Sequence, residues 1–310
     1  MDERKVVRVS PEYCPVFWTI DVVLLSHKIN EQKMEVIVMA FKISGFGSYE
    51  VDKIEARPIQ QGEQQIIVPR KSIVQVRFPG KGMALAYYND QFDLKLGDLV
   101  YVDGKLEGQL GRVVEISYNF KIKISEYKKV VAVCNTTVHG QFFMANSHFV
   151  TFNPATLPKE QISLWFKAPE DENEEYVSGS DDSSFRLEDL SGMKVSPAIA
   201  ERGHDYYMEN RVRYICLDGT HGFAIVEGSE SYAVEFEYCE GEISNLICDC
   251  FCSYNCKHEF AAMLQLRETL DIIEQHYAVE YAETGYFAAI NKGTLFAFAV
   301  DGKEQGSFIL

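Results

Sequence analysis

The sequence lacks any apolar run that approaches the roughly 18 residues of a membrane-spanning helix. Its longest apolar runs, such as 36–41 and 295–300, have the length of a strand. The first ten residues are mostly charged or polar and lack the apolar core of a signal peptide. We therefore expect a soluble protein of the cytoplasm that makes no contact with a membrane.

The composition does not fit disorder, collagen or a coiled coil. Of the 310 residues, 46% are apolar and 25% are charged, as in ordinary globular proteins. A chain of this length has more residues than one small hydrophobic core organises, and it is typical of two modest domains.

Familiar catalytic motifs are also missing. His258-Glu259 begins an H-E-x-x-H pattern, but position 262 is alanine, so the zinc-protease motif fails. The glycines at 45–47 and 80–82 have the spacing of neither a dinucleotide-binding loop nor a P-loop. We therefore expect a protein that is not an enzyme, and keep an enzyme with an unrecognised active site as an alternative.

Positive charge is scarce in the second half of the chain. Residues 1–155 carry 19 Lys and Arg against 17 Asp and Glu, whereas residues 156–310 carry 11 against 29. Because an acidic surface repels phosphate groups, nucleic acid is expected only on the first half. The candidate contacts are basic residues close to Tyr87 and Tyr88, whose rings would suit the stacking of single-stranded bases. These residues, which a solvated barrel rim also explains, are Arg70, Lys71, Arg77 and Lys81.

The pattern of the first half predicts mainly antiparallel β structure. Apolar segments at 16–26 and 34–43 predict a hairpin, and a further strand is expected at 49–56. Short strands then follow at a spacing of about ten residues, which favours a small barrel or a meander. They are expected at 72–78, 84–88, 99–102, 111–116, 120–124 and 129–134.

Part of this region resembles a known module. Tyr87-Tyr88, the Leu-Lys-Leu-Gly-Asp run at 94–98 and the glycine-valine segment 108–114 are similar to the small β-barrel modules of polymerase-suppressor (PSP) proteins. The resemblance covers residues 73–116. Similar modules also occur at the start of primosomal helicases. Turn glycines and core valines make up most of it, so it implies a shape rather than a chemistry.

An acidic segment separates the two halves. Residues 168–189 contain nine Asp and Glu and one arginine, with almost no apolar content, which is typical of a solvated linker. The alternative is that this acidic segment binds a basic partner. The predicted division is a β-rich domain at 1–155, a linker at 156–190 and a second domain at 191–310.

The second half alternates strands with a long helix. A short helix is expected near 197–204, and strands at 211–217, 222–227, 231–238 and 242–248. The segment 258–275 has no Gly or Pro and carries Met263, Leu266, Leu270 and Ile273 on one helical face. Strands are expected again at 286–290, 295–300 and 306–310. The pattern indicates an α+β domain.

Cysteine spacing gives the strongest chemical signal. Four of the eight cysteines fall within nine residues, and His258 follows. Cys248 and Cys250 end a predicted strand, while Cys256 and His258 open the predicted helix. Three thiolates and one imidazole form a tetrahedral zinc set with no position left for water, which indicates a structural ion. Two alternatives are Cys252 in place of Cys248, and buried or redox-active thiols without a metal.

The same residues resemble a zinc-finger family. The segment is similar to the SWIM zinc finger, which has a C-x-C motif, a short loop and a C-x-H motif at the start of a helix. The four ligand positions of that finger match Cys248, Cys250, Cys256 and His258. The RGHDYY lead-in at 202–207 and the CKHEFAAML helix start at 256–264 extend the resemblance to about residues 197–270. Cys252 departs from it, because proline or glycine is common there.

The SWIM resemblance implies a module that binds DNA or protein rather than a reaction. It predicts a non-enzymatic, zinc-binding interaction protein that docks a protein or nucleic-acid partner, and the acidic charge of the second half favours a protein. DNA binding through the N-terminal barrel is the alternative.

Overall fold

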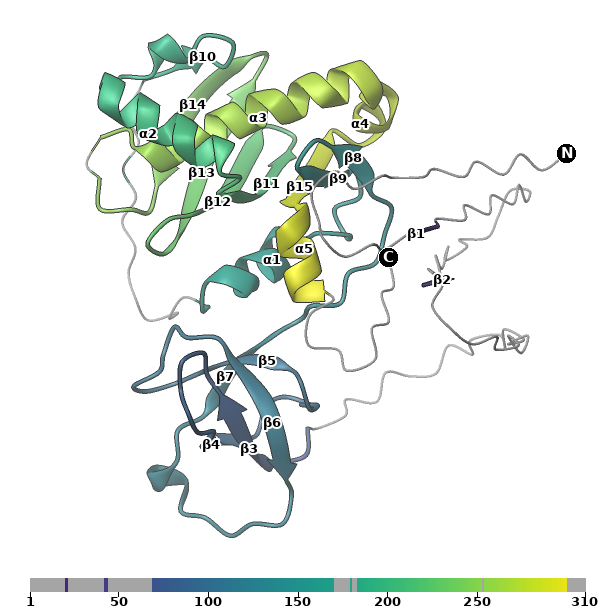
Figure 1. The fold of residues 1–310 in the computed structure, drawn as a ribbon, viewed down its shortest axis with the longest axis vertical. Helices are drawn as coiled ribbons and strands as arrows, with labels where there is room; N and C mark the ends of the chain where they lie inside the picture. Colours follow the sequence, from purple (N-terminus) through teal and green to yellow (C-terminus); the bar gives the residue numbers. More distant parts are fainter. Residues whose placement is uncertain are drawn as a thin grey trace, which may run out of the picture.

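The computed structural model describes residues 20–21, 42–43, 69–169, 179, 183–252 and 254–299. Strand β1 (Ile20–Asp21) pairs antiparallel with β2 (Lys42–Ile43), inside the hairpin predicted at 16–43. The remainder of that hairpin and the strands predicted at 49–56 and 306–310 lie outside the described residues. Figure 1 shows the arrangement of the described elements.

Five short antiparallel strands form a small barrel, which is one of the two arrangements that the sequence favours. They are β3 (Ser72–Arg77), β4 (Leu85–Asn89), β5 (Leu99–Val102), β6 (Gly111–Ser117) and β7 (Val130–Cys134), in the order β4-β3-β6-β5-β7. A parallel bridge between Tyr88 and Lys129 brings the two edge strands together. Alternate residues such as Val74, Val76 and Val113 fill the interior. The strand predicted at 120–124 is wrong, because this stretch is a loop that ends in a 3₁₀ turn at Ile124–Glu126.

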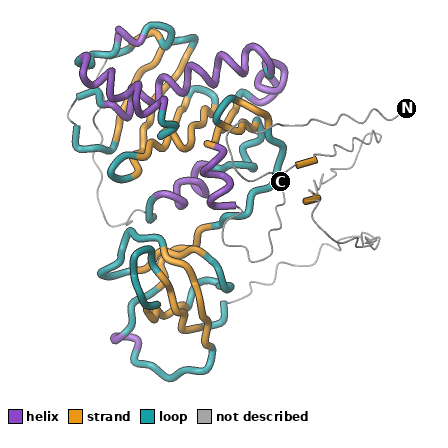
Figure 2. The backbone as a smooth tube through the Cα atoms, viewed as in Figure 1, coloured by secondary structure: helices purple, strands orange, loops and turns teal. Residues whose placement is uncertain are grey.

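An eight-stranded antiparallel sheet forms the larger part of the molecule (Figure 2). Its order is β10-β14-β13-β12-β11-β15-β9-β8. The central meander of β11 (Val212–Asp218), β12 (His221–Glu227), β13 (Ser231–Cys239) and β14 (Glu242–Cys248) matches the predicted strands within one or two residues. The remaining strands are β8 (Phe143–Ala145), β9 (His148–Thr151), β10 (Phe185–Arg186) and β15 (Tyr286–Asn291).

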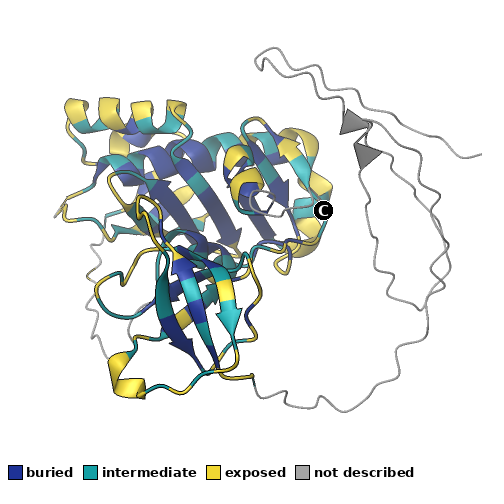
Figure 3. Ribbon diagram, turned by 60° about the horizontal axis from the view of Figure 1, so that its bottom comes forward, coloured by how far each residue is buried: buried dark blue, intermediate teal, exposed yellow. Residues whose placement is uncertain are grey.

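Helices cover both faces of this sheet. On one face, α3 (Lys257–His276) packs Ala262, Met263 and Leu266 into a shared core with the strands, and α2 (Pro197–Met208) lies against α3. On the other face, α1 (Lys159–Phe166) and α5 (Lys292–Ala299) pack with inward residues of β11, β12 and β15. The strands are therefore buried on both sides, as Figure 3 shows in dark blue. A 3₁₀ turn at Leu190–Gly192 and α4 (Ala278–Thr284) complete the described elements.

The strand predicted at 295–300 is wrong, because residues 292–299 form α5. Its run Leu-Phe-Ala-Phe-Ala is apolar throughout, so periodicity could not separate a strand from a buried helix. Asn291 at the end of β15 decides the structure locally, because its Oδ1 accepts a hydrogen bond from the Thr294 N–H (3.2 Å) and starts the helix.

Strand pairing and packing extend across the predicted domain boundaries. β9 pairs with β15, so residues 148–151 share a sheet with the second half. Helix α1 lies within the segment predicted as a linker, and its Trp165 shares a core with Tyr101 of the barrel. The division at 155 and 190 stays a prediction. No helix in the described part of the chain combines the length and apolar character that a bilayer span requires.

Candidate metal centre

The end of β14 and the start of α3 bring four potential metal ligands together. Cys248 is the last residue of β14, and Cys250 lies two residues further along the chain. Cys256 is the N-cap of α3, and His258 lies in the first turn of this helix. Their ligand atoms all lie within 4.8 Å of one another. The structure therefore assembles a Cys₃His group that can hold a metal ion, from the four residues that the sequence predicts.

The spacing of these atoms fits a tetrahedral ion. Nδ1 of His258 lies 3.7 Å from Sγ of Cys248 and 3.6 Å from Sγ of Cys256. With zinc–sulfur bonds of about 2.3 Å and zinc–nitrogen bonds of about 2.0 Å, a tetrahedral edge between the two ligand types is about 3.5 Å. Nδ1 is thus the ligand atom of His258, and the donor set suits zinc.

Local hydrogen bonds fix both arms of the group. Sγ of Cys256 accepts a bond from the Glu259 N–H (3.5 Å), and Oε2 of Glu259 accepts one from the Cys256 N–H (2.7 Å). This reciprocal pair caps α3. On the other arm, Oδ1 of Asp249 accepts a bond from the Ala233 N–H (2.9 Å) and Oδ2 pairs with Lys167. Both segments therefore hold their cysteines before any ion binds.

Burial and sulfur–sulfur contacts alter the protonation of the group. The hydrogen bond with Cys248 lowers the pKa of Cys256, and the same contact raises the pKa of Cys248. Burial raises the pKa of Glu259 to about 8. A divalent cation that binds here would displace the remaining thiol protons, because the thiolate is the form of cysteine that coordinates a metal.

Two aromatic rings enclose His258. The ring of Tyr232 stacks on it with centroids 4.2 Å apart, and Tyr206 contacts it at 5.5 Å. Nε2 of His258 is buried and has no hydrogen-bond partner among the described residues. A Cβ at Gly228 would lie 3.2 Å from that atom, so the glycine leaves room for the ring. Tyr206 belongs to the RGHDYY segment, whereas no sequence signal pointed to Tyr232.

The other described cysteines stay outside the group. Cys252 is exposed although it lies in the loop between the ligands, and Cys239 is exposed as well. Cys134 and Cys216 are buried in the core. The structure therefore places Cys248, rather than Cys252, with Cys250, Cys256 and His258.

The basic candidates lie on the barrel, far along the chain from the Cys₃His group. Arg70, Lys71, Arg77 and Lys81 are all exposed, and the guanidinium of Arg70 lies 4.2 Å from the centre of the Tyr118 ring. The expectation that Tyr87 and Tyr88 offer stacking faces is wrong, because they are only 5% and 3% exposed. Tyr87 points into the barrel core, and the ring of Phe120 and the ammonium of Lys129 lie against the ring of Tyr88.

Comparison with known proteins adds one partial likeness. No family model matches the chain, and no solved structure matches it. A stretch of 69 residues is 36% identical to part of an uncharacterized protein of Methanocaldococcus jannaschii. The match covers 22% of this chain and 29% of that protein, so the chain spans less than a third of the relative's length.

Proposed function

We propose that this protein is a zinc-dependent interaction protein of the SWIM type, which docks a partner protein in the cytoplasm and catalyses no reaction. The Cys₃His group carries the proposal, because four protein ligands of this kind complete a zinc coordination shell. The ion would join the end of β14 to the start of α3 and so fix the loop between them.

A structural role for the ion is supported by its surroundings. Cys256 is 2% exposed and His258 is 4% exposed, which leaves little access for a substrate. A hollow of about 520 Å³ between α2 and α3 is lined by His204, Arg267 and Glu268 among others and by none of the four ligands. A second hollow of about 240 Å³, beside Tyr286, does not include them either.

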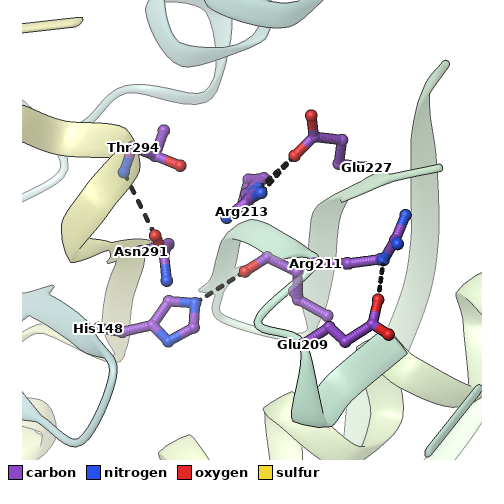
Figure 4. Close-up of polar contacts among 8 residues, drawn as sticks. His148, Glu209, Arg211, Arg213, Glu227, Asn291 and Thr294 are labelled. Carbon is purple, nitrogen blue, oxygen red and sulfur yellow. Dashed lines mark hydrogen bonds and ion pairs between the residues drawn. The ribbon is translucent and has the colours of Figure 1, made fainter. Parts of the chain in front are cut away.

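Charge favours a protein over nucleic acid at the metal centre. Residues 183–299 carry 8 Lys and Arg against 19 Asp and Glu. Two of these cations are already paired, since Arg211 pairs with Glu209 and Arg213 with Glu227, each at 2.5 Å (Figure 4). A surface with so few unpaired cations gives weak attraction for a phosphate backbone.

Affinity purification tests this function. Tagged wild-type protein and the Cys252→Ser variant, which lies outside the group, should retain the same partner protein, and Cys256→Ser should lose it. Equal retention by Cys256→Ser would contradict a zinc-dependent role. An electrophoretic mobility shift series with single- and double-stranded DNA should show no salt-sensitive binding that depends on Cys256.

DNA binding by the barrel is a second candidate, and one observation favours it. Arg77 of β3 lies directly opposite Arg112 of β6 in the sheet register, a pairing of like charges that costs stability without an anion nearby. Residues 70–134 carry 11 Lys and Arg against 7 Asp and Glu. Among the described residues, none of Arg70, Lys71, Arg77 and Lys81 makes an ion pair with an acidic side chain.

The salt series distinguishes this candidate. If the barrel binds DNA, the double variant Arg77→Ala/Lys81→Ala should weaken binding and reduce the slope of log affinity against log salt by about 2, one for each lost phosphate contact. Absence of binding at low salt by the full chain, or an unchanged slope, removes the candidate.

A further inference from the structure

Two aromatic side chains project from the loop that connects the ligands. Phe251 is 99% exposed and Tyr254 is 84% exposed, more than any other large apolar side chain among the described residues. Both lie between Cys250 and Cys256, which are only six positions apart. The next most exposed large apolar side chains, such as Val279 at 70% and Met83 at 68%, lie elsewhere in the fold.

The ends of this loop are held firmly. Asp249 bonds to both backbone groups of Ala233, accepting from its N–H through Oδ1 (2.9 Å) and donating its own N–H to the Ala233 carbonyl (3.1 Å). Cys256 is fixed by its reciprocal bonds with Glu259. A short loop anchored at both ends presents its side chains at a lower entropic cost than a free segment, and this favours binding.

We propose that Phe251 and Tyr254 are the anchors of a docking surface for a protein segment that carries apolar side chains and a net positive charge. This inference rests on the proposed function, in which the ion would join the two ends of the loop that local hydrogen bonds already hold. Exposed aromatic rings each offer on the order of 150–250 Å² for burial. Aromatic residues are also enriched among the few side chains that supply most of the energy of protein–protein binding.

The charges around the loop select the partner's chemistry. Asp249 is neutralised by Lys167, and the ammonium of Lys257 lies over the Tyr206 ring at 4.5 Å. Three thiolates on a divalent ion leave the centre with one negative charge. Glu230, exposed in the turn beside Gly228, adds another. With the acidic excess of residues 183–299, this field attracts Lys and Arg and repels phosphates and anionic lipids.

A defined peptide library tests the surface on the full, zinc-loaded chain. Random 12-residue peptides displayed on phage are selected against the wild-type protein, and the enriched sequences are synthesised and measured by fluorescence anisotropy. We expect enrichment of Lys, Arg and large apolar residues. Binding should fall at least tenfold in Phe251→Ser and in Tyr254→Ser. Met208→Ser, which removes a side chain 62% exposed on α2, is the matched control and should bind as wild type.

Several results would overturn the inference. These are selected peptides that bind the two loop variants as well as wild type, enrichment of acidic peptides, or failure to select any loop-dependent peptide. Loop-dependent binding of a thymidine oligonucleotide or of anionic phosphatidylserine vesicles would equally contradict it. Zinc content, measured in every variant, separates the two proposals: the loop variants should keep their zinc, whereas a wild-type chain without zinc would defeat the proposed function itself.

Discussion

The ring of Tyr232 lies nearly parallel to the ring of His258, with 17° between their planes and 4.2 Å between their centroids. Histidine ligands usually hold their orientation by donating the second ring N–H to an acceptor. Here Nε2 has no such partner among the described residues, and a stacked ring from β13 takes that place. Tyr232 therefore orients the ligand by packing.

Removal of this ring should weaken metal retention. In Tyr232→Leu we expect zinc to pass to a competing chelator at about tenfold lower chelator concentration, the lower end of effects seen when a ligand's supporting partner is lost. Tyr232→Phe keeps the stacked ring and loses only the contact between the hydroxyl and Ser229 Oγ (2.8 Å), so it should behave as wild type. Substitution by Co²⁺ should show an altered visible spectrum in the leucine variant alone. Identical chelator curves for all three proteins would exclude a positioning role.

Close packing of α2 on α3 depends on Gly203. A Cβ at this position would lie 2.8 Å from Cβ of Phe260 and 3.0 Å from the carbonyl oxygen of Lys257. Gly203→Val should therefore lower the free energy of unfolding in urea by about 1–3 kcal/mol, as other overpacked sites do. Ala198→Val, at an exposed position of the same helix, should cost no more than about 0.6 kcal/mol. Equal losses in both variants would contradict the tight contact.

The buried His148 should make stability depend on pH. Burial lowers the pKa of His148 to about 4, from an ordinary value of 6.5. Its Nε2 bonds to the Val212 carbonyl (2.8 Å) and so joins β9 to β11, which begins directly after Arg211 and carries Arg213 (Figure 4). The unfolded chain binds a proton more readily than the folded one. The contribution of neutral His148 to the free energy of unfolding is thus complete above pH 6.5, and it falls by up to about 3 kcal/mol as the pH drops to 4.

His148→Gln should flatten this part of the stability profile, measured by urea unfolding between pH 7 and pH 4. His139→Gln, at an exposed position, should leave the profile of the wild type unchanged. Zinc release, followed with a metal-sensitive dye, identifies any separate contribution from the metal centre. An equally steep profile in His148→Gln would show that another group is responsible.

Local patterns predicted the metal centre better than the fold around it. The ligand spacing and the helix predicted at 258–275, which Cys256 and His258 open, follow from neighbours in the sequence, and the structure forms this helix over Lys257–His276. The antiparallel meander from β11 to β14 also follows, because each turn joins adjacent strands.

Long-range contacts explain what the sequence could not predict. The pairing of β9 with β15 joins residues more than a hundred positions apart and has no local signature. The exposure of Tyr88 depends on whether the barrel closes at Lys129, which a pattern of strands does not determine. Tyr232 became part of the metal centre only because β13 passes beside α3.

Metal analysis tests the central claim most directly. Freshly prepared, reduced protein should contain close to one zinc ion per chain, as should Cys252→Ser, whose thiol lies outside the Cys₃His group. Cys256→Ser should contain none and should lose much of its cooperative unfolding, since a structural zinc contributes on the order of 10 kcal/mol to folding. Reduced wild-type protein that holds no zinc, or Cys256→Ser that holds as much as wild type, would contradict the account.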